Sequence, residues 1–195
     1  MKKLFAVLTS LCLLLSGCQQ ASAEPSCKDI LLLFGRDKVD VLDSLPLHDD
    51  LNTETEHDEE LNTINTDKDG SKETTLIFYN DVLMGVRYLF DDTQTAFAYA
   101  KEIRPEIDEV FGEKTTYPGV ISSSSAYFDD ISDAAELQPV ISYYEDWTPQ
   151  TDEAQISKML DGREAERVDA RLTFIVYPEN GTEIKIRYTA IIKRG

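Results

Sequence analysis

Histidine and carboxylate side chains gather in one short stretch of the sequence, residues 48–60. His48 and Asp49 open this stretch, and His57 and Asp58 lie near its end. Imidazole nitrogens and carboxylate oxygens together form a ligand set that zinc and manganese accept. The stretch is also highly charged and has no apolar periodicity, which predicts an exposed, solvated loop. We prefer the solvated loop, keep divalent-cation binding as the alternative, and expect no other cofactor.

A second stretch resembles the start of a calcium-binding loop. Asn65, Asp67 and Asp69 place oxygens at positions 1, 3 and 5, and Gly70 supplies the sharp turn. The twelfth position, where a bidentate carboxylate closes such a site, is Leu76. The missing carboxylate favours a simple turn between two strands.

The short motifs of common catalytic sites are missing from the sequence. It contains no Gly-x-Ser-x-Gly, His-Glu-x-x-His or Cys-x-x-Cys segment and no glycine-rich phosphate loop. Both histidines lie in the acidic stretch, which gives poor support to general acid or base catalysis. The chain has 37 Asp and Glu residues, so some carboxylate pair must lie close in space, and a hydrolase stays open as a minor alternative.

The most informative residues are Leu15-Ser16-Gly17-Cys18. They end a mostly apolar run, residues 4–15, that follows two lysines, which is the layout of an export signal. The run is shorter than the roughly 20 apolar residues of a transmembrane helix. The stretch resembles a bacterial lipobox, and this resemblance implies cleavage after residue 17 and lipid on Cys18. Secretion as a soluble protein after cleavage at Ala21-Ser22-Ala23 is the alternative.

The lipobox resemblance predicts a protein anchored by lipid to the extracytoplasmic face of a bacterial cell membrane. Residues 1–17 would then be the signal peptide and residues 18–26 a tether. Loss of two lysines changes the chain from 19 basic residues to 17, and 17 minus 37 acidic residues gives a net charge of −20. This charge argues against nucleic acid and anionic lipid as partners. The expected partner is another envelope or extracellular protein.

Residues 27–195 are expected to form one α+β domain, with an antiparallel sheet of hairpins packed on helices. In this reading Cys27 is a free thiol or an intermolecular partner. Capping residues and apolar spacing predict helices over residues 26–34, 37–45, 92–111, 131–137 and 152–160, the third of them kinked or broken near Arg104 by Pro105. Alternation and turn residues predict strands over residues 61–66, 74–79, 82–90, 140–147, 168–177 and 183–193.

Two of the predicted hairpins resemble each other. The first turns at Asn80-Asp81 and the second at residues 178–182. The predicted core-facing residues are Ile77, Tyr79, Val82, Met84, Val86 and Tyr88 in the first hairpin, and Ile184, Ile186, Tyr188 and Ala190 in the second. The likeness suggests a duplicated unit of helix and hairpin, residues 27–91 and 92–195, and a shared β-pattern is the alternative.

Tyr143 and Trp147 are the candidate binding residues. In a strand they share one face with Glu145, and an exposed aromatic pair there would make a contact patch. The preferred alternative is that Trp147, the only tryptophan, belongs to the core.

Residues 35–42 resemble the opening of small lipoproteins with a β-lactamase-inhibitor-protein-like or BamE/SmpA-like domain. Residues 78–83, followed by residues 110–112, resemble uncharacterised lipoproteins in which a hairpin leads into a helix. The resemblance covers residues 28–112 and implies a non-catalytic binding module in which a helix pair packs on a short antiparallel meander. The chain departs from that pattern in the acidic stretch at 48–60 and at Pro46, which no glycine precedes. The predicted function is therefore a membrane-anchored binding module, with a cation-binding surface lipoprotein or a hydrolase as alternatives.

Overall fold

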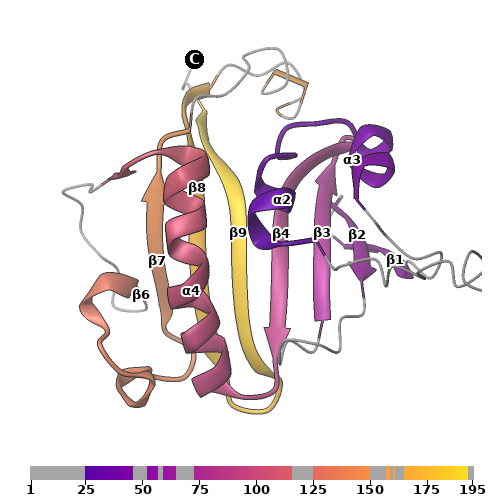
Figure 1. The fold of residues 1–195 in the computed structure, drawn as a ribbon. Helices are drawn as coiled ribbons and strands as arrows, with labels where there is room; N and C mark the ends of the chain where they lie inside the picture. The colour runs from indigo at the N-terminus through magenta and orange to yellow at the C-terminus, as the bar shows by residue number, and fades with distance from the viewer. Residues whose placement is uncertain are drawn as a thin grey trace, which may run out of the picture.

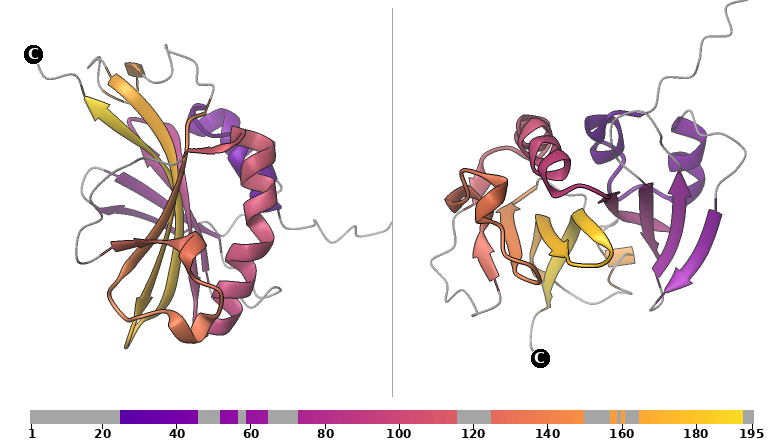
Figure 2. Two further views of the ribbon diagram at one scale, coloured as in Figure 1. Left: turned by 90° about the vertical axis from the view of Figure 1, so that its left-hand side faces the viewer. Right: turned by 90° about the horizontal axis from the view of Figure 1, so that it is seen from below.

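In the part of the chain that the structure describes, the fold is a large, mostly antiparallel sheet with three α-helices on one of its faces (Figures 1 and 2). The computed structural model describes residues 25–45, 52–56, 59–64, 73–115, 125–149, 157–158, 160 and 165–192. The predicted α+β class is confirmed, with the sheet as the larger part. We call the side that carries the helices the covered face and the other side the open face.

The sheet has nine strands in the order β1-β2-β3-β4-β9-β8-β7-β5, and β6 pairs with β7 in parallel. The strands are β1 Asn52–Glu56, β2 Glu59–Ile64, β3 Glu73–Tyr79, β4 Val82–Phe90, β5 Lys114–Thr115, β6 Ser125–Tyr127, β7 Ser142–Trp147, β8 Ala165–Tyr177 and β9 Gly181–Ile192. The two predicted hairpins are β3–β4 and β8–β9, and they join through β4 and β9 at the centre of the sheet.

Helices α2 Cys27–Leu31, α3 Lys38–Ser44 and α4 Thr93–Phe111 begin where their capping residues predict. Ser26 and Asp29 form a reciprocal capping box on α2, and the Asp92 carboxylate accepts the first-turn N–H of Thr95. The predicted break near Arg104 is wrong, because α4 continues through Pro105. Pro105 lies on the exposed side of the helix, where water can satisfy the carbonyl that its missing N–H leaves free.

The first hairpin turns where the sequence predicts, but β3 directs the opposite set of side chains to the core from the set that was predicted. Asn80 and Asp81 both have positive φ, 49° and 60°. The register shifts between Ile77 and Phe78, which leaves Met84 as a bulge in β4. Leu76 and Phe78 therefore join the core under the helices together with Val86, Tyr88 and Leu83. The prediction holds for Met84, Val86 and Tyr88, which belong to that cluster, and Tyr79 packs against it. It is wrong for Ile77 and Val82, which are buried outside the cluster.

The main core lies between the covered face and the helices. Phe128 stacks on Phe174 of β8 with 5.3 Å between ring centroids, and Phe97 of α4 packs against both rings. Each such side chain contributes about 1.5–3 kcal/mol when fully buried. Cys27 is part of this core, and burial raises the pKa of its thiol to about 12.

The acidic stretch is not a loop throughout. Residues 52–56 form β1, and β2 runs from Glu59 to Ile64, so the described part of the strand predicted over 61–66 lies between β1 and β3. The expected exposure holds for β1, whose five residues are all exposed. Its sequence, Asn-Thr-Glu-Thr-Glu, buries nothing, so the strand depends on backbone pairing with β2 and on the hydrogen bond that the Thr53 hydroxyl donates to the Asn62 side chain at 3.2 Å.

The remaining elements differ from the predictions in detail. The expected helix over 131–137 is a single 3₁₀ turn, η2 Ala134–Glu136, preceded by another, η1 Phe128–Asp130. Strand β7 starts at Ser142 because Val140 occupies a turn with φ 58°. The helix predicted over 152–160 falls mostly outside the described residues.

Candidate functional site

Most of the predicted site residues lie outside the part of the chain that the structure describes. These are Cys18, His48, Asp49, His57 and Asp58. The residues that imitate a calcium loop, 65–70, lie outside it as well. Within the described ranges, no group of three or more His, Cys, Asp or Glu is arranged to hold a metal ion. Lipidation and cation binding therefore stay predictions.

Tyr143 and Trp147 do not form an exposed patch. They share one face of β7 as predicted, but this is the covered face, and their exposed fractions are 3% and 0%. The core alternative for Trp147 is confirmed. Its indole N–H donates to the Asp108 carboxylate of α4 at 2.7 Å, which fixes β7 against the helix.

Glu145, which lies between these two aromatic residues on the same face, is a buried carboxylate with 2% exposure. Its Oε1 accepts a hydrogen bond from Arg104 Nη2 at 2.8 Å and another from Lys114 Nζ at 3.3 Å. Arg104 comes from α4 and Lys114 from β5, so three separate elements meet at one carboxylate oxygen.

A second carboxylate closes this network. Asp129 of η1 accepts hydrogen bonds from both Arg104 and Lys114. Two cations thus bridge two carboxylates, and the four charges balance. Charged groups can be buried in a protein only when paired and hydrogen-bonded in this way.

Two cations, Lys101 and Arg104, lie over the aromatic ring of Phe128. Lys101 Nζ lies 5.1 Å from the ring centroid and the Arg104 guanidinium lies 5.9 Å from it. Lys101 also donates to the carbonyl of Ile131 at 3.1 Å. Burial, and then the neighbouring Arg104 charge, lower the pKa of the Lys101 ammonium.

One atom of the network has no hydrogen-bond partner among the described residues. Glu145 Oε2 is buried and accepts no hydrogen bond from the described residues, and among these it is the only carboxylate oxygen in that position. A buried acceptor without a donor costs about 1–3 kcal/mol. A buried oxygen of this kind requires a physical explanation, and one explanation is a hydrogen-bond donor on a bound ligand.

Glu145 lines a cavity of about 170 Å³ at the edge of the sheet. We call it the charged cavity, and its lining residues are Lys114, Thr115, Tyr127, Asp129, Asp130, Glu145 and Asp146. The Tyr127 ring packs against Tyr144 with 5.2 Å between centroids. The cavity therefore combines carboxylates, one ammonium, a hydroxyl and an aromatic wall, a mixture suited to binding a polar group.

The next residue on β7, Asp146, is fully satisfied. Its side chain is on the open face, where Arg171 of β8 donates to both oxygens, at 2.7 and 2.9 Å. The Arg171 guanidinium also lies 4.8 Å from the Tyr144 ring centroid. The hydrogen bonds that Arg171 donates to Asp146 raise the pKa of the Arg171 guanidinium above its usual value, so this group stays charged.

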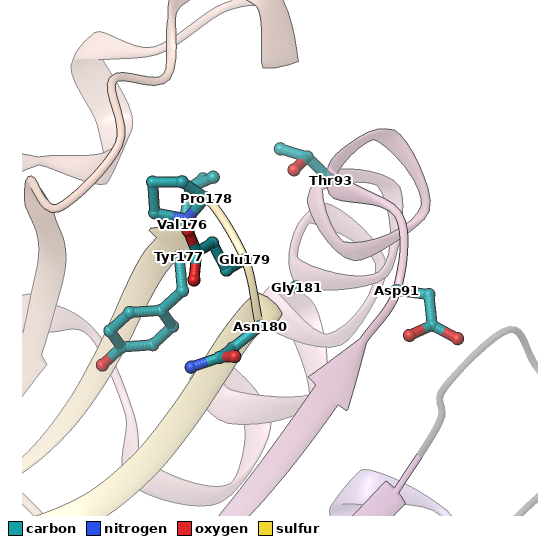
Figure 3. Close-up of a pocket in the computed structure, with 8 residues that line it drawn as sticks. All are labelled: Asp91, Thr93, Val176, Tyr177, Pro178, Glu179, Asn180 and Gly181. Carbon is teal, nitrogen blue, oxygen red and sulfur yellow. The ribbon is translucent and has the colours of Figure 1, made fainter.

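A larger, more open pocket of about 460 Å³ lies at the other end of the sheet (Figure 3). Asp91 and Thr93 come from the start of α4, and the rest of the lining comes from residues 176–181 at the β8–β9 turn. Its lining contains no residue of the buried charge network, so the charged cavity is the better candidate site.

The functional interpretation rests on this geometry, because comparisons with known proteins found no match: no family model, no curated protein and no solved structure matches the chain. In the described part of the chain, no helix is both long and apolar enough to cross a membrane.

Sequence reasoning missed Glu145, although a signal for it was present. A strand with Tyr143 and Trp147 directed into the core must direct Glu145 there too. A carboxylate on a core-facing position requires cationic partners. Those partners could not be identified, because Arg104 and Lys114 are 41 and 31 residues away in the sequence.

Proposed function

We propose that this protein is a lipoprotein anchored at the extracytoplasmic face of a bacterial cell membrane, where it acts as a non-catalytic binding module. The observation that carries the proposal is the segment Leu15-Ser16-Gly17-Cys18 after a basic and apolar leader. Lipid on Cys18 would supply the two or more acyl chains that stable anchoring requires.

The distance between anchor and domain supports this arrangement. Seven residues, 19–25, separate Cys18 from Ser26, which caps α2. A chain of that length spans at most about 25 Å. Because α2 lies on the covered face, the domain would be held from that side, with the open face turned away from the point of attachment (Figure 2).

The charged cavity supports a binding role. Its charged groups come from β5, β7 and η1, and Arg104 of α4 is hydrogen-bonded to two of them, so elements of the folded domain hold them in place. A site built on such elements keeps its geometry before a ligand arrives, and this lowers the cost of binding. With a mature net charge of −20, the partner is a protein or small molecule that is not strongly acidic.

We also infer an internal duplication of the helix-and-hairpin unit. Val86 pairs directly with Ile186 between the two central strands, and Gly85 and Arg87 pair with Arg187 and Lys185. Val86 and Ile186 open the similar segments Val86-Arg87-Tyr88 and Ile186-Arg187-Tyr188, so equivalent residues are paired, as a twofold relation between the hairpins requires. Strands β3 and β2 on one side and β8 and β7 on the other continue the symmetry outward.

Replacing Cys18 tests the anchoring. We expect Cys18→Ala to move the protein from the detergent-rich phase to the aqueous phase, because lipid attachment requires the Cys18 sulfur. Cys27→Ala is the matched control and should stay with the detergent. Mass analysis of the N-terminal peptide identifies the lipid. An unmodified Cys18 in wild-type protein that still sediments with membranes would contradict the proposal.

A further inference from the structure

We propose that the charged cavity binds a primary ammonium group, which donates a hydrogen bond to Glu145 Oε2. The inference rests on the proposed role of this chain as a binding module and specifies the chemistry of its ligand. The group could belong to a small amine or to a lysine side chain of a partner protein, since both present the same three N–H donors.

The first argument is the unsatisfied carboxylate oxygen. Glu145 is 2% exposed, Oε1 already accepts from Arg104 and Lys114, and Oε2 accepts from no described residue. A carboxylate oxygen can only accept, so the missing partner must be a donor. Phosphates and carboxylates are thereby excluded as the group that satisfies it.

The second argument is charge. The lining carries one cation, Lys114, and the four carboxylates of Asp129, Asp130, Glu145 and Asp146. Arg104, Arg171 and Lys101 lie outside the lining and offset these negative charges from the surrounding elements. The groups that face the cavity are therefore mostly carboxylates, which favours a cation over an anion there.

The third argument is the shape and lining of the cavity. A volume of about 170 Å³ exceeds the roughly 30 Å³ share of one water several times, so an alkylammonium head with part of its stem has room. The carboxylates of Asp129 and Asp130 offer acceptors for the other N–H groups, and the Tyr127 ring offers an aromatic wall for the cation. A bare metal ion fits less well, because no group of three ligating side chains is present among the described residues.

The test uses the full chain in detergent and two cations of equal charge. Propylammonium has three N–H donors, whereas tetramethylammonium has none. At constant ionic strength we expect propylammonium to shift the amide NMR signals of Lys114, Asp129 and Glu145 saturably. Tetramethylammonium should bind at least tenfold more weakly. A capped Gly-Lys-Gly peptide is the third probe, and its affinity relative to propylammonium tells a protein partner from a small amine.

Two variants locate the contact. Glu145→Gln replaces Oε2 by an NH₂ donor and should abolish the propylammonium response, while Asp40→Asn, at an exposed position on α3, should leave it unchanged. Unchanged Trp147 fluorescence shows that each variant is folded. Equal binding of the two cations, binding that survives Glu145→Gln, or no saturable response would each overturn the proposal and indicate water at Oε2.

The anchoring experiment is independent of this one. Glu145→Gln should not change detergent partitioning, and Cys18→Ala should not change the propylammonium response. A failed titration with intact anchoring therefore rejects the ammonium site alone.

Discussion

Glu145 and Asp146 are neighbours on β7 and are buried to the same extent, 2% and 3% exposed, yet they are satisfied differently. Asp146 faces the open side of the sheet and has both oxygens bonded by Arg171. Glu145 faces the helices and has one oxygen bonded by two cations and the other by none. The two carboxylates are thus equally buried but differ in role: Asp146 is bonded within the sheet, and Glu145 is the one for which we propose a ligand.

The open face pairs its charges across strands. Arg87 pairs with Glu73 at 3.3 Å, and Arg187 reaches from β9 across β4 and β3 to Glu59 of β2 at 2.8 Å. Glu73 and Glu59 are each paired with an arginine on the same face of the sheet, so their positions need no further partner. Glu145, in contrast, lines a cavity and has one oxygen that accepts no hydrogen bond from the described residues.

The largest expected effect tests the structural side of this comparison. Gly85 of β4 pairs with Arg187 of β9, and a Cβ atom added at Gly85 would lie 2.8 Å from Arg187 Cβ and 2.9 Å from the Ile186 carbonyl oxygen. Gly85→Ala should therefore cost about 3 kcal/mol of unfolding free energy, measured by urea denaturation. Gly112→Ala is the control for backbone strain alone: no atom lies near its Cβ position, but its φ of 86° and ψ of −158° lie in a region essentially restricted to glycine, so it should cost about 2 kcal/mol.

Removing the partner of Asp146 should have the next largest effect. Arg171→Met keeps most of the aliphatic stem but leaves a 3% exposed carboxylate side chain without its bidentate donor. Breaking a fully buried pair in this way costs about 3–5 kcal/mol, and the partial exposure of Arg171 reduces this to about 2 kcal/mol. An unchanged urea midpoint would show that Asp146 does not depend on Arg171.

The smallest effect compares the two carboxylates directly. Asp146→Asn places an amide NH₂ against an Arg171 donor, and should cost about 2 kcal/mol. Glu145→Gln keeps an acceptor for Arg104 and removes an oxygen that had no partner, so it should cost about 1 kcal/mol or less. If Glu145→Gln destabilises the protein more than Asp146→Asn, Oε2 has a structural partner and the comparison fails.

Several parts of the fold could be read from local sequence. Alternation identified β9, because Ile184 and Ile186 are directed to the core while Lys185 and Arg187 are not. Asn80-Asp81 identified the first turn through its tolerance of positive φ. Apolar residues at spacings of three and four identified α4. Each of these signals lies within one element.

The parts that failed depend on more than one element. Strand β1 has no apolar face and exists through pairing with β2, so its own residues carried no sign of it. The bulge at Met84 reversed the predicted face of β3, since one extra residue moves a strand's side chains to the opposite side. The charge network beside the cavity joins α4, β5, β7 and η1, and only the packed chain brings Arg104 to Glu145.

Side-chain carboxyl ¹³C NMR tests the central claim most directly, because it observes the two neighbouring carboxylates in one sample. As propylammonium is added to the full chain in detergent, we predict a saturable shift of the Glu145 carboxyl carbon that is clearly larger than the shift of Asp146, which lines the same cavity but has both oxygens bonded by Arg171. The Glu145 midpoint should match that of the amide signals in the same titration. Equal shifts of both carbons, or a shift of Asp146 alone, would contradict the assignment of Glu145 as the ligand-binding carboxylate.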